Sequence, residues 1–186
     1  YVEEAYTSKK YAFVTDYVRL YAMYMCGGVY MDTDVEVVRS LDKFLSCRAF
    51  SGFESTHYVP TGIMASEKGL PVIKELLEYY TGRHFLKADG SQDTTTNCVS
   101  ITNIMLSHGL KLDGKLQTVE DFTFYPADFF CPFENETGIL RKTDNTAAIH
   151  WFNKSWLPKG MRFRCKITRA CRRLFGKNCL DWLKRK

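Results

Sequence analysis

Residues 24–38 read YMCGGVYMDTDVEVV, and this stretch decides the fold. Before it, residues 12–26 carry apolar side chains at i, i+3, i+4 and i+7 spacing, which predicts an amphipathic helix. Gly27-Gly28 should end that helix, because glycine readily takes the left-handed conformation of a helix C-terminus. Residues 29–31 then form a short apolar strand, and Asp32 stands at its C-terminal end.

Asp32 and Asp34 are unusual after an apolar run, because strand interiors usually avoid Asp. Two carboxylates at positions i and i+2, where a chain turns, can reach one hard cation. Mg2+ and Mn2+ prefer carboxylate oxygens and keep positions open for water and phosphate. The end of a strand is also where open α/β sheets bind ligands. The pair therefore predicts a divalent metal site for a phosphorylated substrate.

Asp-x-Asp alone is weak evidence, since roughly half of all chains with this composition contain the pattern by chance. A calcium EF-hand loop that starts at Asp32 is excluded, because Val37 and Lys43 stand where it requires Gly and Glu. A phosphatase of the haloacid dehalogenase type, with Asp32 as nucleophile, is the weaker competitor. It favours Thr or Val where this chain has Glu36.

The rest of the chain alternates helices with short strands, which is typical of an α/β sheet domain. Further helices are expected over 71–81, 94–108 and 161–175, and extended segments over 36–38, 48–54, 61–66, 122–125 and 147–152. The chain has 186 residues, of which 45% are hydrophobic and 25% charged. These values are those of an ordinary soluble globular domain.

The seven cysteines are odd in number and contain no C-x-x-C pair, which argues against a disulfide framework or a zinc knuckle. Reduced thiols in a reducing compartment are expected instead, and hence a cytoplasmic protein. No apolar run approaches the 18 or so residues of a membrane span.

Residues 159–186 carry 11 Lys and Arg against one Asp, a local charge of +10, whereas residues 1–158 carry −5. The segment divides the chain into a domain over 1–158 and a basic amphipathic helical tail. The tail suits an anionic membrane surface and a peripheral location at its inner face; a solvated helix is the alternative. Nucleic acid is not expected as a partner, because no aromatic-basic platform appears.

Asp16 and Arg19 are three residues apart in the first helix, opposite the apolar stripe of Val14, Val18 and Met25. By themselves they predict a solvated ion pair. Together, residues 12–42 resemble the "(S/T)D-x-x-R … L-Y-x-x-G-G-x-Y-x-D-x-D" signature of DXD-type sugar transferases. The similarity is to glycosyltransferase family 32, which groups bacterial capsular-polysaccharide transferases with fungal outer-chain mannosyltransferases. It extends through "AFSGFE", "TGIMASEKGLPVIKELLEYY", "YPADFFCP" and "AIHWFNKSWL", to about residue 158.

The resemblance implies a GT-A-like, Rossmann-like domain with a mixed central sheet flanked by helices. It also implies transfer of a hexose, with retention of configuration, from a UDP- or GDP-sugar to a glycan or lipid-linked saccharide in surface polysaccharide biosynthesis. The family's domain begins with a further apolar strand that builds the nucleotide pocket. We expect that first strand to be missing from this chain, which starts after it.

Residue roles follow from the same resemblance. Asp32 and Asp34 hold Mn2+ or Mg2+ and the diphosphate, while Asp16 and Arg19 contact the hexose. The "HWFNKSW" segment offers His150, Asn153 or Ser155 to the metal and diphosphate. The donor-binding residues expected are Asp16, Arg19, Tyr30, Asp32, Ser155 and Trp156. Glu54 and Asp93 are acceptor-facing candidates in loops. A sugar-binding module without catalysis is the remaining alternative.

Overall fold

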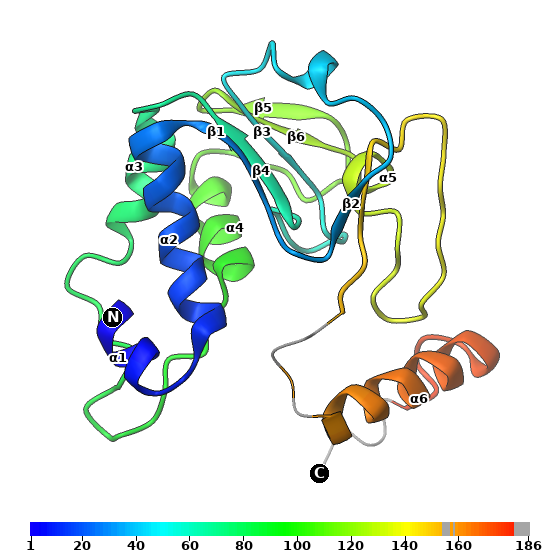
Figure 1. The fold of residues 1–186 in the computed structure, drawn as a ribbon. Helices are drawn as coiled ribbons and strands as arrows, with labels where there is room; N and C mark the ends of the chain where they lie inside the picture. Colours follow the sequence, from blue (N-terminus) through cyan, green and yellow to red (C-terminus); the bar gives the residue numbers. More distant parts are fainter. Residues whose placement is uncertain (154–156, 158, 181–186) are drawn as a thin grey trace.

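The computed structural model describes residues 1–153, 157 and 159–180 (Figure 1). Ser155 and Trp156, two of the expected donor-binding residues, lie outside the described residues. The helices are α1 (Val2–Thr7), α2 (Tyr11–Cys26), η1 (Asp42–Phe44, a 3-10 turn), α3 (Pro71–Glu78), α4 (Asn97–Ser107), α5 (Ala127–Phe130) and α6 (Lys159–Phe175). The strands are β1 (Gly28–Met31), β2 (Val35–Val37), β3 (Ala49–Gly52), β4 (Ile63–Ser66), β5 (Gln117–Val119), β6 (Phe122–Tyr125) and β7 (Ala148–His150).

Five strands form a central mixed sheet in the order β1-β4-β3-β6-β5. The β3–β6 pair is parallel, and the other neighbouring pairs are antiparallel. Helices α2, α3 and α4 lie together beside this sheet (Figure 1). The expected mixed sheet flanked by helices is therefore present, and the architecture is consistent with a GT-A-like domain.

The three inner strands of the sheet, β4, β3 and β6, are buried on both faces, because their side chains alternate between two apolar clusters with the period of the pleat. Met64 and the two phenylalanines of β6 pack with α2, α3 and α4. Phe50, Ile63 and Ala65 point the other way, against Phe44 of η1 and Phe130 of α5. This alternation explains why β3 and β4 read as nearly continuous apolar runs rather than as polar–apolar patterns.

The face of helix α2 that packs against the core is the one opposite the apolar stripe in its sequence. Asp16, Leu20 and Met23 are buried, whereas Val18 and Met25 are about half exposed. The expectation of a solvated Asp16 was wrong. The i, i+4, i+7 spacing of the three buried residues forms one helical stripe, and polar partners described below allow an aspartate to stand in it.

Gly27 ends α2 as predicted, but its backbone is not in the expected left-handed helical conformation. It has φ of 69° and ψ of −170°, so the chain passes directly into β1 rather than through a left-handed cap. A Cβ added to Gly27 would lie 2.7 Å from the backbone nitrogen of Lys68. Glycine is therefore required here by both conformation and space.

A separate two-stranded antiparallel sheet joins β2 to β7. Its register pairs Val35 with His150, Glu36 with Ile149 and Val37 with Ala148. The backbone N–H of Trp151 donates to the carbonyl of Asp34 at 3.0 Å and extends the pairing. The segment that follows β1 is thereby joined to β7, the last strand in the described part of the chain, and two motifs far apart in the sequence come together.

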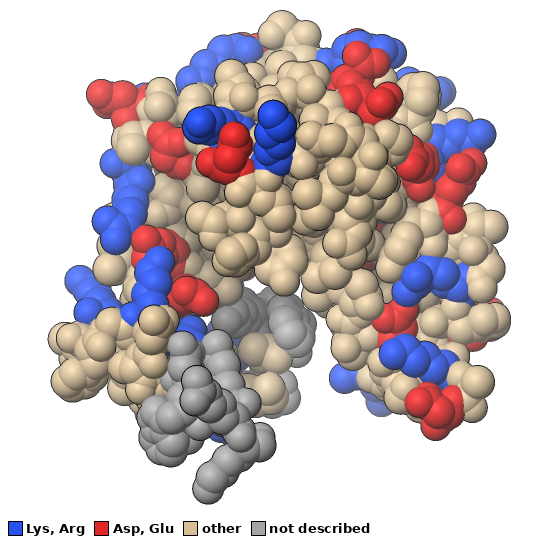
Figure 2. Space-filling model, turned by 180° about the vertical axis from the view of Figure 1, so that it is seen from behind, with Lys and Arg blue, Asp and Glu red and all other residues tan. Residues whose placement is uncertain are grey.

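The other predicted helices and strands are present to within three residues at either end. Four short elements were not anticipated, namely α1, η1, β5 and α5. They have between three and six residues each, too few to display a helical or strand period. Among the described residues, no helix combines the length and the apolar character needed to cross a bilayer. On the rear face of the molecule, basic and acidic side chains are interspersed (Figure 2).

Candidate metal and donor site

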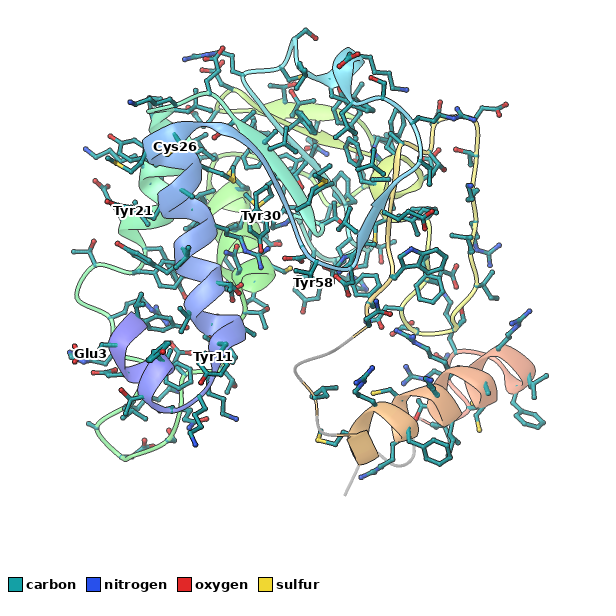
Figure 3. The ribbon with its side chains drawn as sticks, in the orientation of Figure 1. Glu3, Tyr11, Tyr21, Cys26, Tyr30 and Tyr58 are labelled. Carbon is teal, nitrogen blue, oxygen red and sulfur yellow. The ribbon has the colours of Figure 1, made fainter. Side chains whose placement is uncertain are left out.

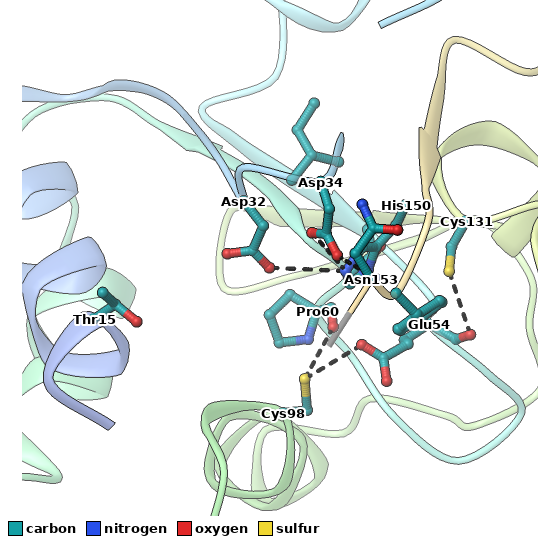
Figure 4. A network of polar contacts seen from close by, with 12 residues as sticks. Thr15, Asp32, Asp34, Glu54, Pro60, Cys98, Cys131, His150 and Asn153 are labelled. Atoms are coloured by element: carbon teal, nitrogen blue, oxygen red, sulfur yellow. Dashed lines mark hydrogen bonds and ion pairs between the residues drawn. The ribbon is translucent and has the colours of Figure 1, made fainter. Parts of the chain in front are cut away.

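The β2–β7 pairing places His150 beside both aspartates of the Asp-x-Asp motif (Figure 4). The Nε2 atom of His150 lies 3.4 Å from Oδ1 of Asp34 and 4.0 Å from Oδ2 of Asp32. One ligand atom from each of the three residues lies within 4.8 Å of the other two. The backbone N–H of Asn153 donates to Oδ2 of Asp34 at 2.7 Å. Asn153 thus orients a carboxylate through its main chain.

Two carboxylate oxygens and one imidazole nitrogen form a donor set that suits a divalent metal ion. The ring of His150 is held from one side by Phe152, whose ring centroid is 3.9 Å away. Its Nδ1 atom is buried and has no hydrogen-bond partner in the described part of the chain. The ring is therefore oriented by packing and by the two aspartates, with Nε2 toward them.

Gly62, the residue before β4, leaves the space that this arrangement needs. A Cβ at Gly62 would lie 3.0 Å from Nδ1 of His150, 3.0 Å from Cγ2 of Val35 and 3.1 Å from Oδ2 of Asp32. The carbonyl of Gly62 also accepts the backbone N–H of Asp32 at 2.8 Å. Gly62 thus lies directly behind the cluster of Asp32, Asp34 and His150. The donor atoms of these three residues fit a divalent cation.

Arg19 links the helix to the Asp-x-Asp motif. Its Nη2 atom lies 3.1 Å from Oδ1 of Asp32 and 3.5 Å from Oδ1 of Asp16. The hydroxyl of Tyr30 donates to the same Asp32 oxygen at 2.8 Å, and the guanidinium lies 4.5 Å from the centre of the Tyr30 ring. Burial alone would lower the pKa of Arg19, but the two carboxylates raise it, so the residue holds its charge.

Asp16 is buried because other groups satisfy its carboxylate. The backbone N–H of Asn97, the first residue of α4, donates to Oδ2 at 3.0 Å, and the Asn97 side chain donates to the Asp16 carbonyl at 2.9 Å. Asp16 therefore caps a helix from a distant part of the chain. Burial nevertheless raises the pKa of Asp16 to about 6.

Asp34 has the opposite electrostatic environment. The hydrogen bond from His150 lowers its pKa, and the backbone N–H of Asn153 adds to this effect. The Asp34 carboxylate is thus kept ionised, the form that a metal ligand requires. Asp34 and Asp16 therefore differ in character: the pKa of Asp34 is lowered beside the imidazole, whereas burial raises the pKa of Asp16.

These groups line one cavity of about 700 Å³. Its wall includes the four residues of the motif and His150, together with Tyr30, Glu54, Tyr58, Asn97, Cys98, Asn135 and Phe152. Tyr30 and Tyr58 lie on the side of α2 that faces the strands, and Tyr21 lies on its other side (Figure 3). A cavity of this size accommodates a small polar ligand.

Glu54, one of the two acceptor candidates, lies on the cavity wall. Burial raises its pKa, and the Cys98 thiol donates to its Oε2 atom at 3.6 Å. Asp93, the other acceptor candidate, is placed elsewhere. It is 6% exposed, pairs with Arg83 and accepts the backbone N–H of Thr95 at 3.1 Å. It does not line the cavity, so these contacts give it a structural part in its own loop.

Sequence reasoning missed Gly62 and Asn97. Gly62 stood in a turn-like Pro-Thr-Gly sequence, which signals a turn but not what lies behind it. Asn97 lay inside a predicted helix whose start was placed three residues too early. The Asn97 pairing with Asp16 joins residues 81 positions apart, which no local spacing reveals.

Comparison with known proteins finds a similarity in the N-terminal part of the chain. Residues 1–51 match the family model described as the glycosyltransferase sugar-binding region containing a DXD motif. The matched segment contains Asp16, Arg19, Asp32 and Asp34, and it ends in β3. This similarity supports a glycosyltransferase. No curated protein and no solved structure matches the chain significantly. The resemblance of the later segments stays a prediction.

Proposed function

We propose that the protein is a metal-dependent glycosyltransferase that moves a hexose from a UDP- or GDP-sugar to a glycan or lipid-linked saccharide. The observation that carries the proposal is the pairing of Val35 with His150, which brings an imidazole to both aspartates of the Asp-x-Asp motif. Retention of anomeric configuration and a place in surface polysaccharide biosynthesis extend the proposal by resemblance to glycosyltransferase family 32.

In this proposal Asp32, Asp34 and His150 hold Mn2+ or Mg2+. A divalent cation bound there supplies positive charge that stabilises the departing diphosphate. Asn153 fixes the Asp34 carboxylate through its backbone N–H, and Phe152 holds the imidazole in position. These contacts pre-organise the ligand atoms, so little rearrangement is needed when the cation and the donor bind.

Arg19 and Asp16 orient the donor. Arg19 carries a fixed positive charge on the cavity wall, between the helix and the motif. The carboxylate of Asp16 is anchored by Asn97 and reaches the same cavity, where it can accept hydrogen bonds from sugar hydroxyls. Glu54 is the remaining wall carboxylate available to an acceptor hydroxyl, and burial raises its pKa, which favours a role in proton transfer.

A thermal-shift panel of UDP- and GDP-sugars, each with and without Mn2+, tests this function. One nucleotide class should stabilise the protein only when Mn2+ is present, because ligands that bind the folded state raise its melting temperature. Asp34→Asn should abolish the shift, whereas Asp144→Asn, which changes a fully exposed carboxylate away from the cavity, should keep it. No Mn2+-dependent shift with any donor would contradict the proposal.

The phosphatase alternative makes a different prediction. An enzyme that uses Asp32 as nucleophile would be stabilised by a phosphate-mimicking fluorometallate and would need no nucleotide. In the structure Oδ1 of Asp32 is already engaged by Arg19 and Tyr30, which disfavours nucleophilic attack from that atom. Stabilisation by the fluorometallate alone would favour the phosphatase.

A further inference from the structure

Helix α6 is attached to the rest of the protein through one face. Arg169 donates to the carbonyl and the side-chain oxygen of Asn135, each at 2.9 Å, and to the carbonyl of Phe152 at 3.1 Å. Arg172 lies 4.0 Å from the carboxylate of Glu136. The arc of the helix that carries these two arginines therefore faces the body of the protein.

The opposite arc of α6 is apolar and faces solvent. At 100° per residue, Phe163, Ile167 and Leu174 fall within about 40° of one another and roughly opposite the two anchoring arginines. Their exposed fractions are 64%, 49% and 76%. Soluble proteins rarely leave such a row of large apolar side chains in water, so this arc is a surface that something covers.

Basic side chains border the apolar arc on both sides. On the same projection Lys166 and Arg173 lie on one border and Arg164 on the other, and all three are exposed. The first turn of α6 contains no acidic residue. An apolar arc between rows of positive charge matches an anionic bilayer, where apolar side chains enter the interface and Lys and Arg meet lipid phosphates.

The anchoring contacts place α6 next to the cavity. Asn135 and Phe152, which accept hydrogen bonds from Arg169, both line the cavity that contains Asp32, Asp34 and His150. In Figure 1, α6 lies below the loop that connects α5 to β7, far from α1 and α3. A surface that covers the outer arc of α6 therefore lies on the same side of the molecule as this wall of the cavity.

We propose that α6 docks the protein onto an anionic membrane surface through the arc of Phe163, Ile167 and Leu174. The helix lies in the interface plane, with Lys166, Arg173 and Arg164 at the level of the lipid phosphates. The docked protein presents its cavity near the bilayer. Provided that the proposed function holds, this position suits an acceptor saccharide carried on a lipid.

Vesicle flotation of the full chain tests the docking. The protein should float with vesicles of phosphatidylcholine mixed with phosphatidylglycerol, and remain at the bottom with vesicles of phosphatidylcholine alone. Neutralising the border with Arg164→Gln, Lys166→Gln and Arg173→Gln should lower the partition coefficient about 100-fold, since each basic residue near the surface contributes about fivefold. Replacing the three residues of the apolar arc with Ser should lower it by about tenfold or more.

A matched control comes from another exposed apolar row. Val18→Ser, Tyr21→Ser and Met25→Ser change half-exposed side chains on α2, without basic neighbours on that face of the helix. This variant should float as the wild type does. Circular dichroism and thermal melting should show that each variant remains folded, since none of the changed side chains is buried.

Equal flotation with neutral and anionic vesicles, or undiminished flotation of both α6 variants, would overturn the proposal. So would tighter binding to duplex DNA or RNA than to anionic vesicles, because the basic tail would then serve a nucleic acid. The assay contains no metal and no nucleotide. Flotation without a Mn2+-dependent thermal shift would therefore leave the docking intact and remove only its connection to sugar transfer.

Discussion

Val35 and His150 lie directly opposite each other across the β2–β7 pair. Val35 immediately follows Asp34, so this pairing fixes the distance between the imidazole and the Asp-x-Asp motif. His150 lies in β7, and the two aspartates lie in the tight turn between β1 and β2, so the paired strands set the position of all three ligand residues. A site built on paired strands is positioned more accurately than one built on loops.

Gly62→Ala should weaken the metal site. The added methyl group meets His150, Val35 and Asp32 at 3.0–3.1 Å, and the paired strands β2 and β7 hold Val35 and His150 so that they cannot easily move away. We expect Mn2+ affinity to fall about tenfold and the free energy of unfolding to fall by about 1–3 kcal/mol. Electron paramagnetic resonance titration of Mn2+ and urea unfolding measure the two effects.

Gly160→Ala is the matched control for this substitution, because no atom lies within 4 Å of its added Cβ and its φ is not positive. It should leave Mn2+ affinity unchanged and stabilise α6 slightly. If Gly62→Ala has the Mn2+ affinity and the stability of the wild type, the cluster of Asp32, Asp34 and His150 does not depend on the space left by Gly62.

Arg19→Ala should destabilise the protein more than loss of an exposed ion pair would. It leaves Asp16 and Asp32 without the cation between them, and Asp16 is buried. Removing one partner of a buried pair costs about 3–5 kcal/mol. Adding Asp16→Asn should restore a large part of that loss, and a double-mutant cycle in urea measures the coupling. Additive effects of the two substitutions would contradict this account of the pair.

Asp16 should make stability depend on pH in the acidic range. Burial raises its pKa from 3.8 to about 6, so the folded protein holds this proton more tightly than the unfolded chain does. As pH rises from 3.8 to about 6, wild type therefore loses stability relative to Asp16→Asn, whose amide oxygen still accepts the Asn97 N–H. The difference should reach about 3 kcal/mol.

Urea unfolding of both proteins across this range checks the prediction. Asp144→Asn, at a fully exposed position, should follow the wild-type profile. A constant difference in stability between wild type and Asp16→Asn at every pH would mean that Asp16 has its ordinary pKa in the folded protein.

The sequence predicted the helix–glycine–strand order around the Asp-x-Asp motif and most of the longer elements, because each carries its own periodic pattern or stop signal. It did not predict which face of α2 is buried. Val18 and Met25 formed the more apolar stripe, but the core receives Leu20 and Met23. Asp16 can join them only because Asn97 and Arg19 satisfy its carboxylate, and those partners are tertiary contacts.

The candidate site was likewise predicted from the sequence only in part. Asp32, Asp34, Asp16 and Arg19 lie within one local motif, and the structure brings all four to one cavity with His150. His150 was one of three open choices in its segment, because nothing in the local sequence states the register of β7 against β2. Asp93 resembled a surface carboxylate in a loop, but its ion pair with Arg83 ties it into that loop instead.

The most direct test is Mn2+-dependent turnover of a nucleotide sugar by the Asp32→Asn, Asp34→Asn double variant. Wild type and Asp144→Asn should consume the donor that the thermal-shift panel identifies, and turnover should stop when Mn2+ is chelated. The double variant should be less stable than the wild type, because Arg19 loses its Asp32 partner, but circular dichroism should show it folded at the assay temperature. Its turnover should be at background level, because it lacks both carboxylate ligands. Wild-type turnover by the folded double variant would contradict the assignment of a metal-dependent glycosyltransferase.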